Sequence, residues 1–149
     1  MKLIRSFTLA VIIAVLCIIN AKEDNNSGIK ISTSEPAAGG PGTFTTVGIT
    51  NGGAPFCLTG IVESYNYTAI IKNKTVEMSR KTFNCSDGSG TFVLDVKPAR
   101  KATRPSSWDV VGGTGNFMAM WGSGSSTTSI DPSPSAPKSE SLKGNFHFR

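Results

Sequence analysis

Two stretches of the chain decide its fold, Asp87-Gly-Ser-Gly-Thr-Phe-Val-Leu-Asp95 and Trp108-Asp-Val-Val-Gly-Gly-Thr-Gly-Asn-Phe117. In both of them apolar and polar residues alternate, which is the two-residue period of a β-strand with one buried face. Both also contain closely spaced glycines, and glycine adopts the backbone angles of tight turns at the lowest cost. The two stretches therefore predict short strands that are connected by tight turns.

The same alternation extends in both directions from these stretches. Strands are predicted over residues 43–49, 56–67 with a continuation to 72 past a bend, 75–85, 91–97, 107–111, 122–130 and 142–149. No window after the N-terminal apolar segment has the 3.6-residue period of a helix. About eight short strands at even spacing predict an all-β fold, either a sandwich or a small antiparallel eight-stranded barrel. We expect the barrel, because closure removes the exposed edges of so many strands.

The N-terminus has the organisation of a secretory signal peptide. A basic start with Lys2 and Arg5 precedes an apolar run over residues 7–19, and a polar segment follows Ala21. This pattern predicts cleavage after Ala21 and a secreted, extracellular protein, or a periplasmic one in a bacterium. An uncleaved membrane anchor is the alternative, but the apolar run is shorter than the ~20 residues that span a bilayer.

The chain after residues 1–21 divides into two predicted parts. Residues 22–42 are rich in turn-forming residues and are expected to form a flexible arm, with a short edge strand at 29–33, and residues 43–149 are expected to form the barrel. Signal cleavage would remove two of the positive charges behind the formal net charge of +5, and so small a charge argues against a nucleic-acid partner. No other stretch is long and apolar enough to span a membrane.

The cysteines predict one disulfide. Cys17 lies in the signal peptide, so Cys57 and Cys85 remain as an even pair in an exported chain, which is the usual setting of a disulfide. Two free buried thiols or a metal-binding pair are the alternatives. His147 is the only histidine, and two cysteines with one histidine make a poor zinc site, so neither a metal nor a cofactor is expected.

Candidate site residues lie on one face of the strand at 56–67. Glu63 alternates there with Tyr65 and Tyr67, and a carboxylate between aromatic rings inside a cavity would have catalytic potential. The tyrosines would then be ligand-binding candidates. The alternative is that Glu63 is an ordinary carboxylate on the outer face of the strand.

Two further motifs each have a functional and a structural interpretation. The segment 112–115, Gly-Gly-Thr-Gly, suggests a phosphate cradle, but neither the lysine nor the helix of such a loop follows, so a turn is expected. The segment Phe117-Met-Ala-Met-Trp121 would either grip an apolar ligand through Phe117 and Trp121 or plug one end of the barrel.

Surface features add two expectations. Four cations at Lys97, Arg100, Lys101 and Arg104 would hold an acidic glycan or an anionic lipid surface, or form a solvated loop. Acceptor sequons for N-glycosylation begin at Asn25, Asn66, Asn73 and Asn84, of which Asn66 and Asn73 are the better candidates because Asn84 adjoins a cysteine.

The glycine motifs resemble the secreted proteins of the allene oxide cyclase-like (dirigent-like) barrel superfamily. The similar segments are 82–92, 108–117 and 122–124, and Cys57 matches the first cysteine of the pattern. The resemblance implies an eight-stranded antiparallel barrel with an internal cavity, in some members oligomeric, and in the plant enzymes an activity on hydrophobic oxylipins or phenoxy radicals. The acidic catalytic residues of those enzymes have no identifiable counterparts in this chain.

The sequence therefore predicts a secreted, non-catalytic barrel that binds a small apolar ligand or a surface glycan. This expectation depends on the lack of a nucleophile–base pair, a metal set and a cofactor loop in the sequence. A cyclase- or dirigent-like enzyme is the first alternative, since such chemistry needs little more than a shaped pocket. A structural extracellular protein with a filled barrel is the second, and the resemblance makes a homo-oligomer an expected assembly of either form.

Overall fold

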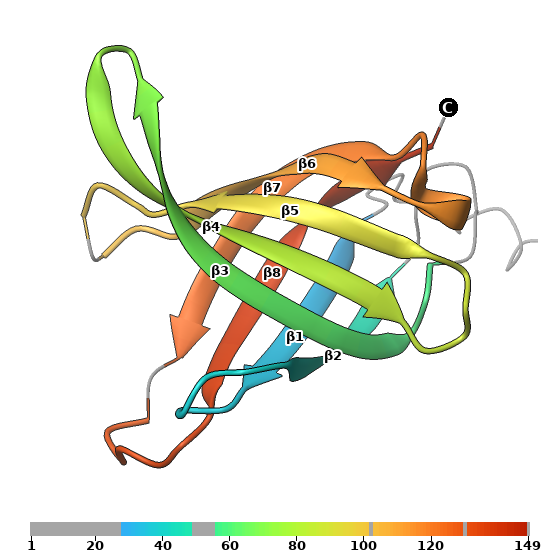
Figure 1. The fold of residues 1–149 in the computed structure, drawn as a ribbon, viewed down its shortest axis with the longest axis horizontal. Helices are drawn as coiled ribbons and strands as arrows, with labels where there is room; N and C mark the ends of the chain where they lie inside the picture. Colours follow the sequence, from blue (N-terminus) through green and yellow to red (C-terminus); the bar gives the residue numbers. More distant parts are fainter. Residues whose placement is uncertain (1–27, 49–55, 102, 130, 149) are drawn as a thin grey trace, which may run out of the picture.

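The protein is a closed barrel of eight antiparallel strands, as predicted (Figure 1). The computed structural model describes residues 28–48, 56–101, 103–129 and 131–148, so the expected signal peptide lies outside it. The strands are β1 Ile29–Glu35, β2 Gly42–Gly48, β3 Thr59–Ile71, β4 Lys74–Cys85, β5 Thr91–Lys97, β6 Ser106–Gly113, β7 Trp121–Ser129 and β8 Lys138–His147, and a short 3-10 helix η1 spans Gly115–Phe117. Within these ranges no helix is long and apolar enough to cross a membrane.

The barrel begins earlier in the chain than the sequence indicated. Residues 22–42 were expected to form a flexible arm, whereas β1 pairs with β2 on one side and with β8 on the other and so closes the sheet. Ile29 and Ile31 are buried, with exposed fractions of 2% and 0%. The alternation of β1 covers too few residues to distinguish a central strand from an edge strand. Its pairing with both β2 and β8 shows that it is not an edge strand.

One end of the barrel, called here the closed end, is filled with aromatic side chains. Phe83 stacks on Phe92 with ring centroids 4.5 Å apart, and Trp108 stacks on Phe146 at 4.9 Å. Phe56, from the connection before β3, and Phe117, from η1, pack against each other at 5.3 Å. Phe117 is fully buried, so this part of the segment 117–121 plugs the barrel as one of its two interpretations predicted.

The two glycine motifs of the sequence meet at the closed end. The backbone N–H of Thr114 donates to the carbonyl oxygen of Thr91 at 2.8 Å, and the N–H of Asn116 donates to that of Ser89 at 2.9 Å. Gly90 has a φ of +135°, and a Cβ atom there would overlap the carbonyl oxygen of Thr114. Gly112 and Gly113 thus end β6, and the turn that was expected over 112–115 is confined to Thr114 and Gly115, which lie against the β4–β5 loop.

The predicted disulfide between Cys57 and Cys85 is confirmed, and it also lies at the closed end. The two Cα atoms are 5.8 Å apart, and the bond joins the connection before β3 to the last residue of β4. Both cysteines are buried, and the hydroxyl of Thr46 donates a hydrogen bond to the carbonyl oxygen of Cys57. The bond therefore ties the β2–β3 connection to the aromatic core.

The hairpin of β3 and β4 is longer than its neighbours and projects from the opposite end of the barrel (Figure 1). β2 pairs with β3 only as far as Val62, while β3 and β4 remain in continuous register to the pair Ile71–Lys74. The bend that was expected after residue 67 is thus absent from this hairpin. Its turn consists of Lys72 and Asn73, whose φ angles are 49° and 59°.

Candidate functional site at the open end of the barrel

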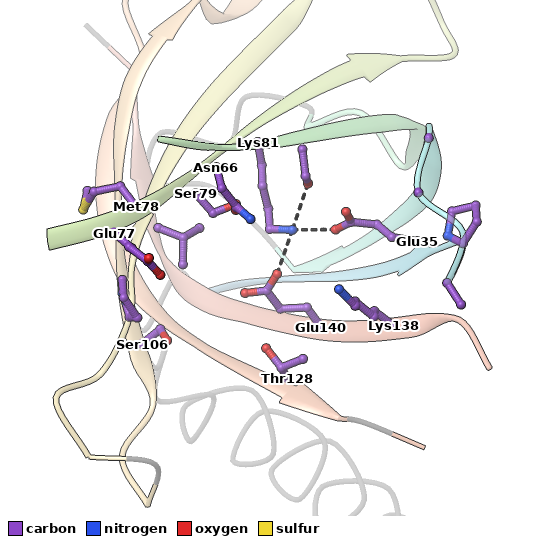
Figure 2. A pocket seen from close by; sticks show the side chains of 17 residues that line it. Glu35, Asn66, Glu77, Met78, Ser79, Lys81, Ser106, Thr128, Lys138 and Glu140 are labelled. Atoms are coloured by element: carbon purple, nitrogen blue, oxygen red, sulfur yellow. Dashed lines mark hydrogen bonds and ion pairs between the residues drawn. The ribbon is translucent and has the colours of Figure 1, made fainter. Parts of the chain in front are cut away.

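The end from which the hairpin projects, called here the open end, contains a pocket of about 580 Å³ (Figure 2). This volume lies within the ~300–1,000 Å³ of typical small-molecule sites. The pocket is bordered by the β1–β2 loop, the β3–β4 hairpin and the start of the β5–β6 loop. Its wall carries hydroxyl and amide groups from five strand positions, namely Ser64, Asn66, Ser79, Ser106 and Thr128.

The centre of the pocket is a buried lysine between two glutamates. Lys81, which is 6% exposed, extends inward from β4 and contacts Glu35 at the end of β1 and Glu140 near the start of β8. Its ammonium nitrogen is 3.0 Å from Glu140 Oε2 and 3.0 Å from the hydroxyl of Ser64. An ammonium group has three N–H donors, so these contacts use its full hydrogen-bonding capacity.

The surroundings of Lys81 keep it charged. Burial by itself would lower the pKa of this lysine, but the negative charges and hydrogen bonds of Glu140 and Glu35 outweigh burial and raise the pKa above its usual range. A lysine that acts as a nucleophile needs the opposite shift, because only the neutral amine attacks a carbonyl group. The geometry therefore makes Lys81 a fixed cation that orients two carboxylates, and the carboxylate oxygens remain acceptors facing the pocket.

Two buried hydroxyl groups lie beneath the floor of the pocket. Thr33 pairs in register with Glu140, and Ser126 lies one inward position below Thr128 on β7. Their exposed fractions are 4% and 2%, and neither hydroxyl oxygen has a hydrogen-bond partner among the described residues. Buried hydroxyls without partners are uncommon, so they extend the polar character of the pocket into the middle of the barrel.

The loops and the hairpin turn at the open end, together called here the rim, are rich in exposed cations, and of those described there Lys138 alone lines the pocket itself. They lie in the hairpin turn, in the β5–β6 loop and at the start of β8, namely Lys72, Lys74, Arg100, Lys101, Arg104 and Lys138. Lys97, also in the predicted basic cluster, is half-buried at the end of β5. Exposed acids on the same rim are fewer, Glu77 and Asp131. Three of the four cations of the predicted basic cluster, Arg100, Lys101 and Arg104, are thus part of a larger basic rim.

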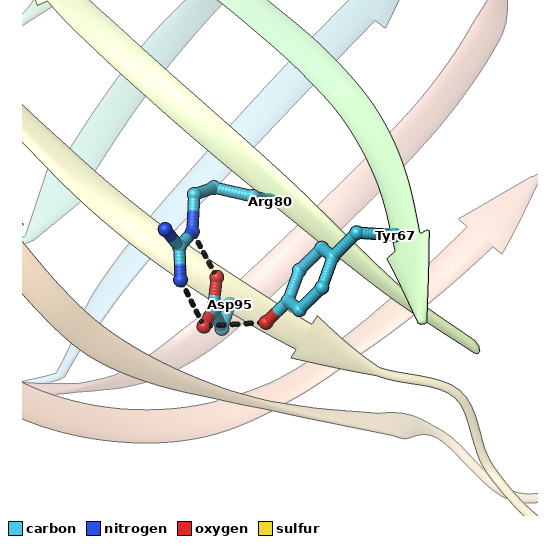
Figure 3. Close-up of polar contacts among 3 residues, drawn as sticks. All are labelled: Tyr67, Arg80 and Asp95. Atoms are coloured by element: carbon cyan, nitrogen blue, oxygen red, sulfur yellow. Dashed lines mark hydrogen bonds and ion pairs between the residues drawn. The ribbon is translucent and has the colours of Figure 1, made fainter. Parts of the chain in front are cut away.

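A second polar cluster lies on the outer wall, at the base of the projecting hairpin (Figure 3). Asp95 on β5 accepts two hydrogen bonds from Arg80, at 2.6 and 2.7 Å, and one from the hydroxyl of Tyr67 at 2.7 Å. The bonds from Arg80 and then from Tyr67 lower the pKa of Asp95, and the bond to Asp95 raises the pKa of Tyr67. Both carboxylate oxygens of Asp95 thus accept hydrogen bonds from residues of the hairpin, and the cluster fastens the hairpin to β5.

The predicted site residues on β3 do not line the pocket. Glu63 is exposed on the outer face of β3, and its neighbour Val62 is buried on the inner face. Glu63 therefore has the position of an ordinary carboxylate on the outer face, which was the alternative interpretation. Tyr65 is 53% exposed on the same face, and its ring centroid is 5.9 Å from that of Tyr67. The structure therefore brings the two tyrosines together on the outer wall. Neither they nor Glu63 lines the pocket.

The other predicted ligand-binding residues are also separated from the pocket. Phe117 belongs to the aromatic core of the closed end. Trp121 is 51% exposed on the outer face and stacks on His147, with ring centroids 4.1 Å apart. The apolar segment 117–121 is thus divided between the core and the outer surface.

One of the sequons lies at the pocket. Asn66 lines it, and Asn73 is an exposed residue of the hairpin turn. Asn84 is exposed on β4 next to Cys85, and Asn25 precedes the described residues. An N-glycan on Asn73 would point away from the barrel, whereas one on Asn66 would occupy the pocket.

Sequence reasoning missed the residues at the centre of the pocket. Glu35 was assigned to the flexible arm, Lys81 to an unremarkable strand, and Glu140 to the segment before the last strand. A signal for Lys81 is present, because it occupies the same face of β4 as the core residues Phe83 and Cys85. A charged residue in phase with a buried face predicts a polar interior at that level of a barrel.

No cluster of three or more potential metal ligands occurs among the residues that the structure describes. Comparison with known proteins finds no matching family model, no matching curated protein and no matching solved structure. The resemblance to allene oxide cyclase-like barrels remains a prediction from the glycine motifs.

Proposed function

We propose that this protein is an exported binding protein whose ligand is a sugar, held in the pocket at the open end of the barrel. The observation that carries the proposal is the chemistry of the pocket wall, which offers hydroxyl, amide and carboxylate groups from several strands. Sugars expose many hydroxyl groups in fixed directions, and each of them needs a hydrogen-bond partner when water is displaced.

The Lys81 cluster supports a ligand of this kind. Because Lys81 holds Glu35 and Glu140 in place, their oxygens can accept hydrogen bonds without first losing side-chain freedom. Hydrogen bonds to charged acceptors are about twice as strong as those between neutral groups. Asn66 supplies both an acceptor and two donors at the same wall, which matches the mixed character of a sugar hydroxyl.

The same chemistry favours a sugar over the small apolar ligand that was the other expectation. An apolar ligand in this pocket would cover charged and hydroxyl groups without pairing them, which costs free energy for each group. The aromatic side chains that would receive such a ligand fill the closed end themselves. The cyclase- or dirigent-like alternative has no support from Glu63, which lies on the outer wall.

The test is a titration of the purified chain with a panel of neutral mono- and oligosaccharides, followed by heteronuclear NMR. We expect chemical-shift changes at Ser64, Asn66, Thr128 and Glu140, and saturable binding by at least one sugar. The substitution Asn66→Ala should weaken that binding about tenfold, which corresponds to the loss of one or two hydrogen bonds. Asn145→Ala, at an exposed position on the outer face of β8, is the matched control and should leave binding unchanged.

An apolar probe such as a medium-chain fatty acid is titrated in parallel. Binding of the fatty acid at the pocket residues, with no response to any sugar of the panel, would overturn the proposal. Sugar binding that Asn66→Ala and Asn145→Ala weaken equally would also contradict it, because the pocket would then not be the site.

A further inference from the structure

We infer that the natural ligand of the open end is an acidic polysaccharide, with its sugar hydroxyls in the pocket and its anionic groups on the basic rim. This inference rests on the proposed function and names the class of sugar polymer that the site would select. It depends on where the charges of the described surface lie.

The exposed charges are distributed unevenly along the barrel. On the rim of the open end, the exposed cations Lys72, Lys74, Arg100, Lys101, Arg104 and Lys138 outnumber the exposed acids Glu77 and Asp131. On the remaining described surface the balance is reversed, with Lys30 and Lys143 against Glu63, Asp87 and Asp109. A surface region with an excess of one sign of charge attracts a ligand of the opposite sign and increases its rate of association.

The rim cations are not neutralised within the described part of the chain. The ion pairs there involve only Arg80 with Asp95 and Lys81 with Glu35 and Glu140. Arg80 lies on the outer wall and Lys81 inside the pocket, so the cations of the rim keep their charge available. A bound polyanion would pair with them directly.

The interior of the pocket would reject the anionic groups and accept the hydroxyls. Lys81 already uses its donors on Glu35, Glu140 and Ser64, so it cannot bind an incoming carboxylate or sulfate. An anionic group near the two glutamates would also be repelled by their charge. A ligand that contacts both the pocket and the rim must therefore carry neutral hydroxyl groups for the pocket and negative charges for the rim. An acidic polysaccharide has both kinds of group.

Two other classes of polyanion fit this surface less well. A lipid bilayer is flat, whereas the β3–β4 hairpin projects beyond the other loops of the open end (Figure 1). Single-stranded nucleic acid is usually bound by stacking its bases on aromatic side chains. No aromatic residue lines the described pocket, and Tyr65 and Tyr67 lie on the outer face of the hairpin.

The experiment measures binding of polygalacturonate to the purified chain by isothermal titration calorimetry, at low and at near-physiological salt. Polygalacturonate with fully methyl-esterified carboxyl groups is the matched ligand, because it has the same backbone and hydroxyls without the charge. We expect the acidic polymer to bind at least about tenfold more tightly than the ester at low salt, and the difference to shrink as salt screens the charges.

Two double variants assign the effect to the rim. Lys101→Gln with Arg104→Gln removes two rim cations, and we expect it to weaken binding of the acidic polymer about tenfold while leaving binding of the ester unchanged. Lys30→Gln with Lys143→Gln removes the same charge from a cross-strand pair on the outer wall and is the control, which should leave both ligands unaffected.

The outcomes separate this inference from the proposed function. If neutral sugars and the ester bind through Asn66 but the acidic polymer gains nothing from the rim, the inference is overturned and the proposed function stands. If no sugar binds at all, both are overturned. Binding of phosphatidylserine vesicles or of single-stranded DNA that depends on Lys101 and Arg104, and that exceeds polygalacturonate binding, would overturn the inference in favour of that partner.

Discussion

The two ends of the barrel follow the same strand alternation but have opposite interiors. At the closed end the inward positions carry Phe83, Phe92, Phe146 and Trp108, which fill the space between the strands. At the open end the inward positions of the same sheet carry short polar and charged side chains around Lys81, and a pocket remains. Both ends belong to the same closed sheet, and the size and polarity of the inward side chains distinguish the filled end from the end that retains a pocket.

The change from one interior to the other occurs along single strands. On β1 the inward residues pass from Ile29 and Ile31 to Thr33 and Glu35, and on β4 they pass from Phe83 to Lys81. We interpret the closed end as the source of stability and the open end as the site of binding. Each of the following changes tests that division, in order of decreasing expected effect.

Truncation of the central aromatic residue should have the largest effect. Phe92 is fully buried and contacts the rings of Phe44, Phe83 and Phe117. Phe92→Ala should lower the free energy of unfolding by about 4 kcal/mol, through lost burial and the cavity that remains. Urea denaturation measures this loss, and Tyr65→Ala, on the exposed outer face, should cost less than about 1 kcal/mol. Equal losses in both variants would contradict the assignment of stability to the closed end.

Removal of the buried cation tests the cost of the polar interior. Lys81→Met should destabilise the fold by about 3 kcal/mol, because it leaves the carboxylates of Glu35 and Glu140 close together without their cation. Adding Glu35→Gln and Glu140→Gln to this variant should restore most of the stability, since no uncompensated charge remains. The triple variant should bind sugar more weakly than the unmodified protein, because amide oxygens are weaker acceptors than carboxylate oxygens. Urea denaturation and the sugar titration together measure both effects, and unchanged sugar affinity in the triple variant would show that the charge of the carboxylates does not contribute to binding.

Removal of the disulfide should affect only the closed end. The bond closes a loop between residues that are 28 positions apart, so Cys57→Ala with Cys85→Ala should lower stability by about 3 kcal/mol at neutral pH. Sugar affinity of the folded variant should be unchanged, because neither cysteine lines the pocket. Thermal unfolding and calorimetric titration check the two statements. A folded variant that binds sugar more weakly would show that the two ends are coupled.

The smallest expected effect concerns the outer wall that fastens the hairpin. Since the pKa of Asp95 is lowered in the fold, this group stabilises the protein above its unfolded pKa of about 3.9, and the contribution is lost as the pH falls through the folded value. Asp95→Asn should cost about 1 kcal/mol near pH 7, because Arg80 is partly solvent-exposed, and should reduce the fall in stability below pH 5.

Urea denaturation at several pH values between about 3 and 7 tests this prediction. Asp109→Asn is the matched control, because Asp109 faces Asp95 in the register of β5 and β6 but is exposed. It should change stability by less than about 0.5 kcal/mol. A pH profile of Asp95→Asn identical to that of the unmodified protein would remove Asp95 as the titrating group.

Much of the fold follows from local pattern. The glycine-bounded strand 91–97 was predicted with the boundaries that β5 has, and the alternation of β3 correctly divided its residues between the two faces. The disulfide and the barrel were also predictable. An even pair of cysteines in a chain that is predicted to be exported favours a disulfide, and many short strands favour a closed barrel. Of the two interpretations of Phe117, the plug at one end is the one that the structure supports.

What the tertiary structure decided is the location of the site. Glu35, Lys81 and Glu140 are far apart in the sequence, and they meet only because β1 pairs with β8 and the barrel brings β4 across from them. Alternation assigns a residue to a face, but it does not indicate at which level of a barrel the residue lies. That level depends on strand register and closure, which arise from long-range pairing. The sequence by itself thus determined the strands, their faces and the disulfide, while the closed sheet determined which end is filled and which is open.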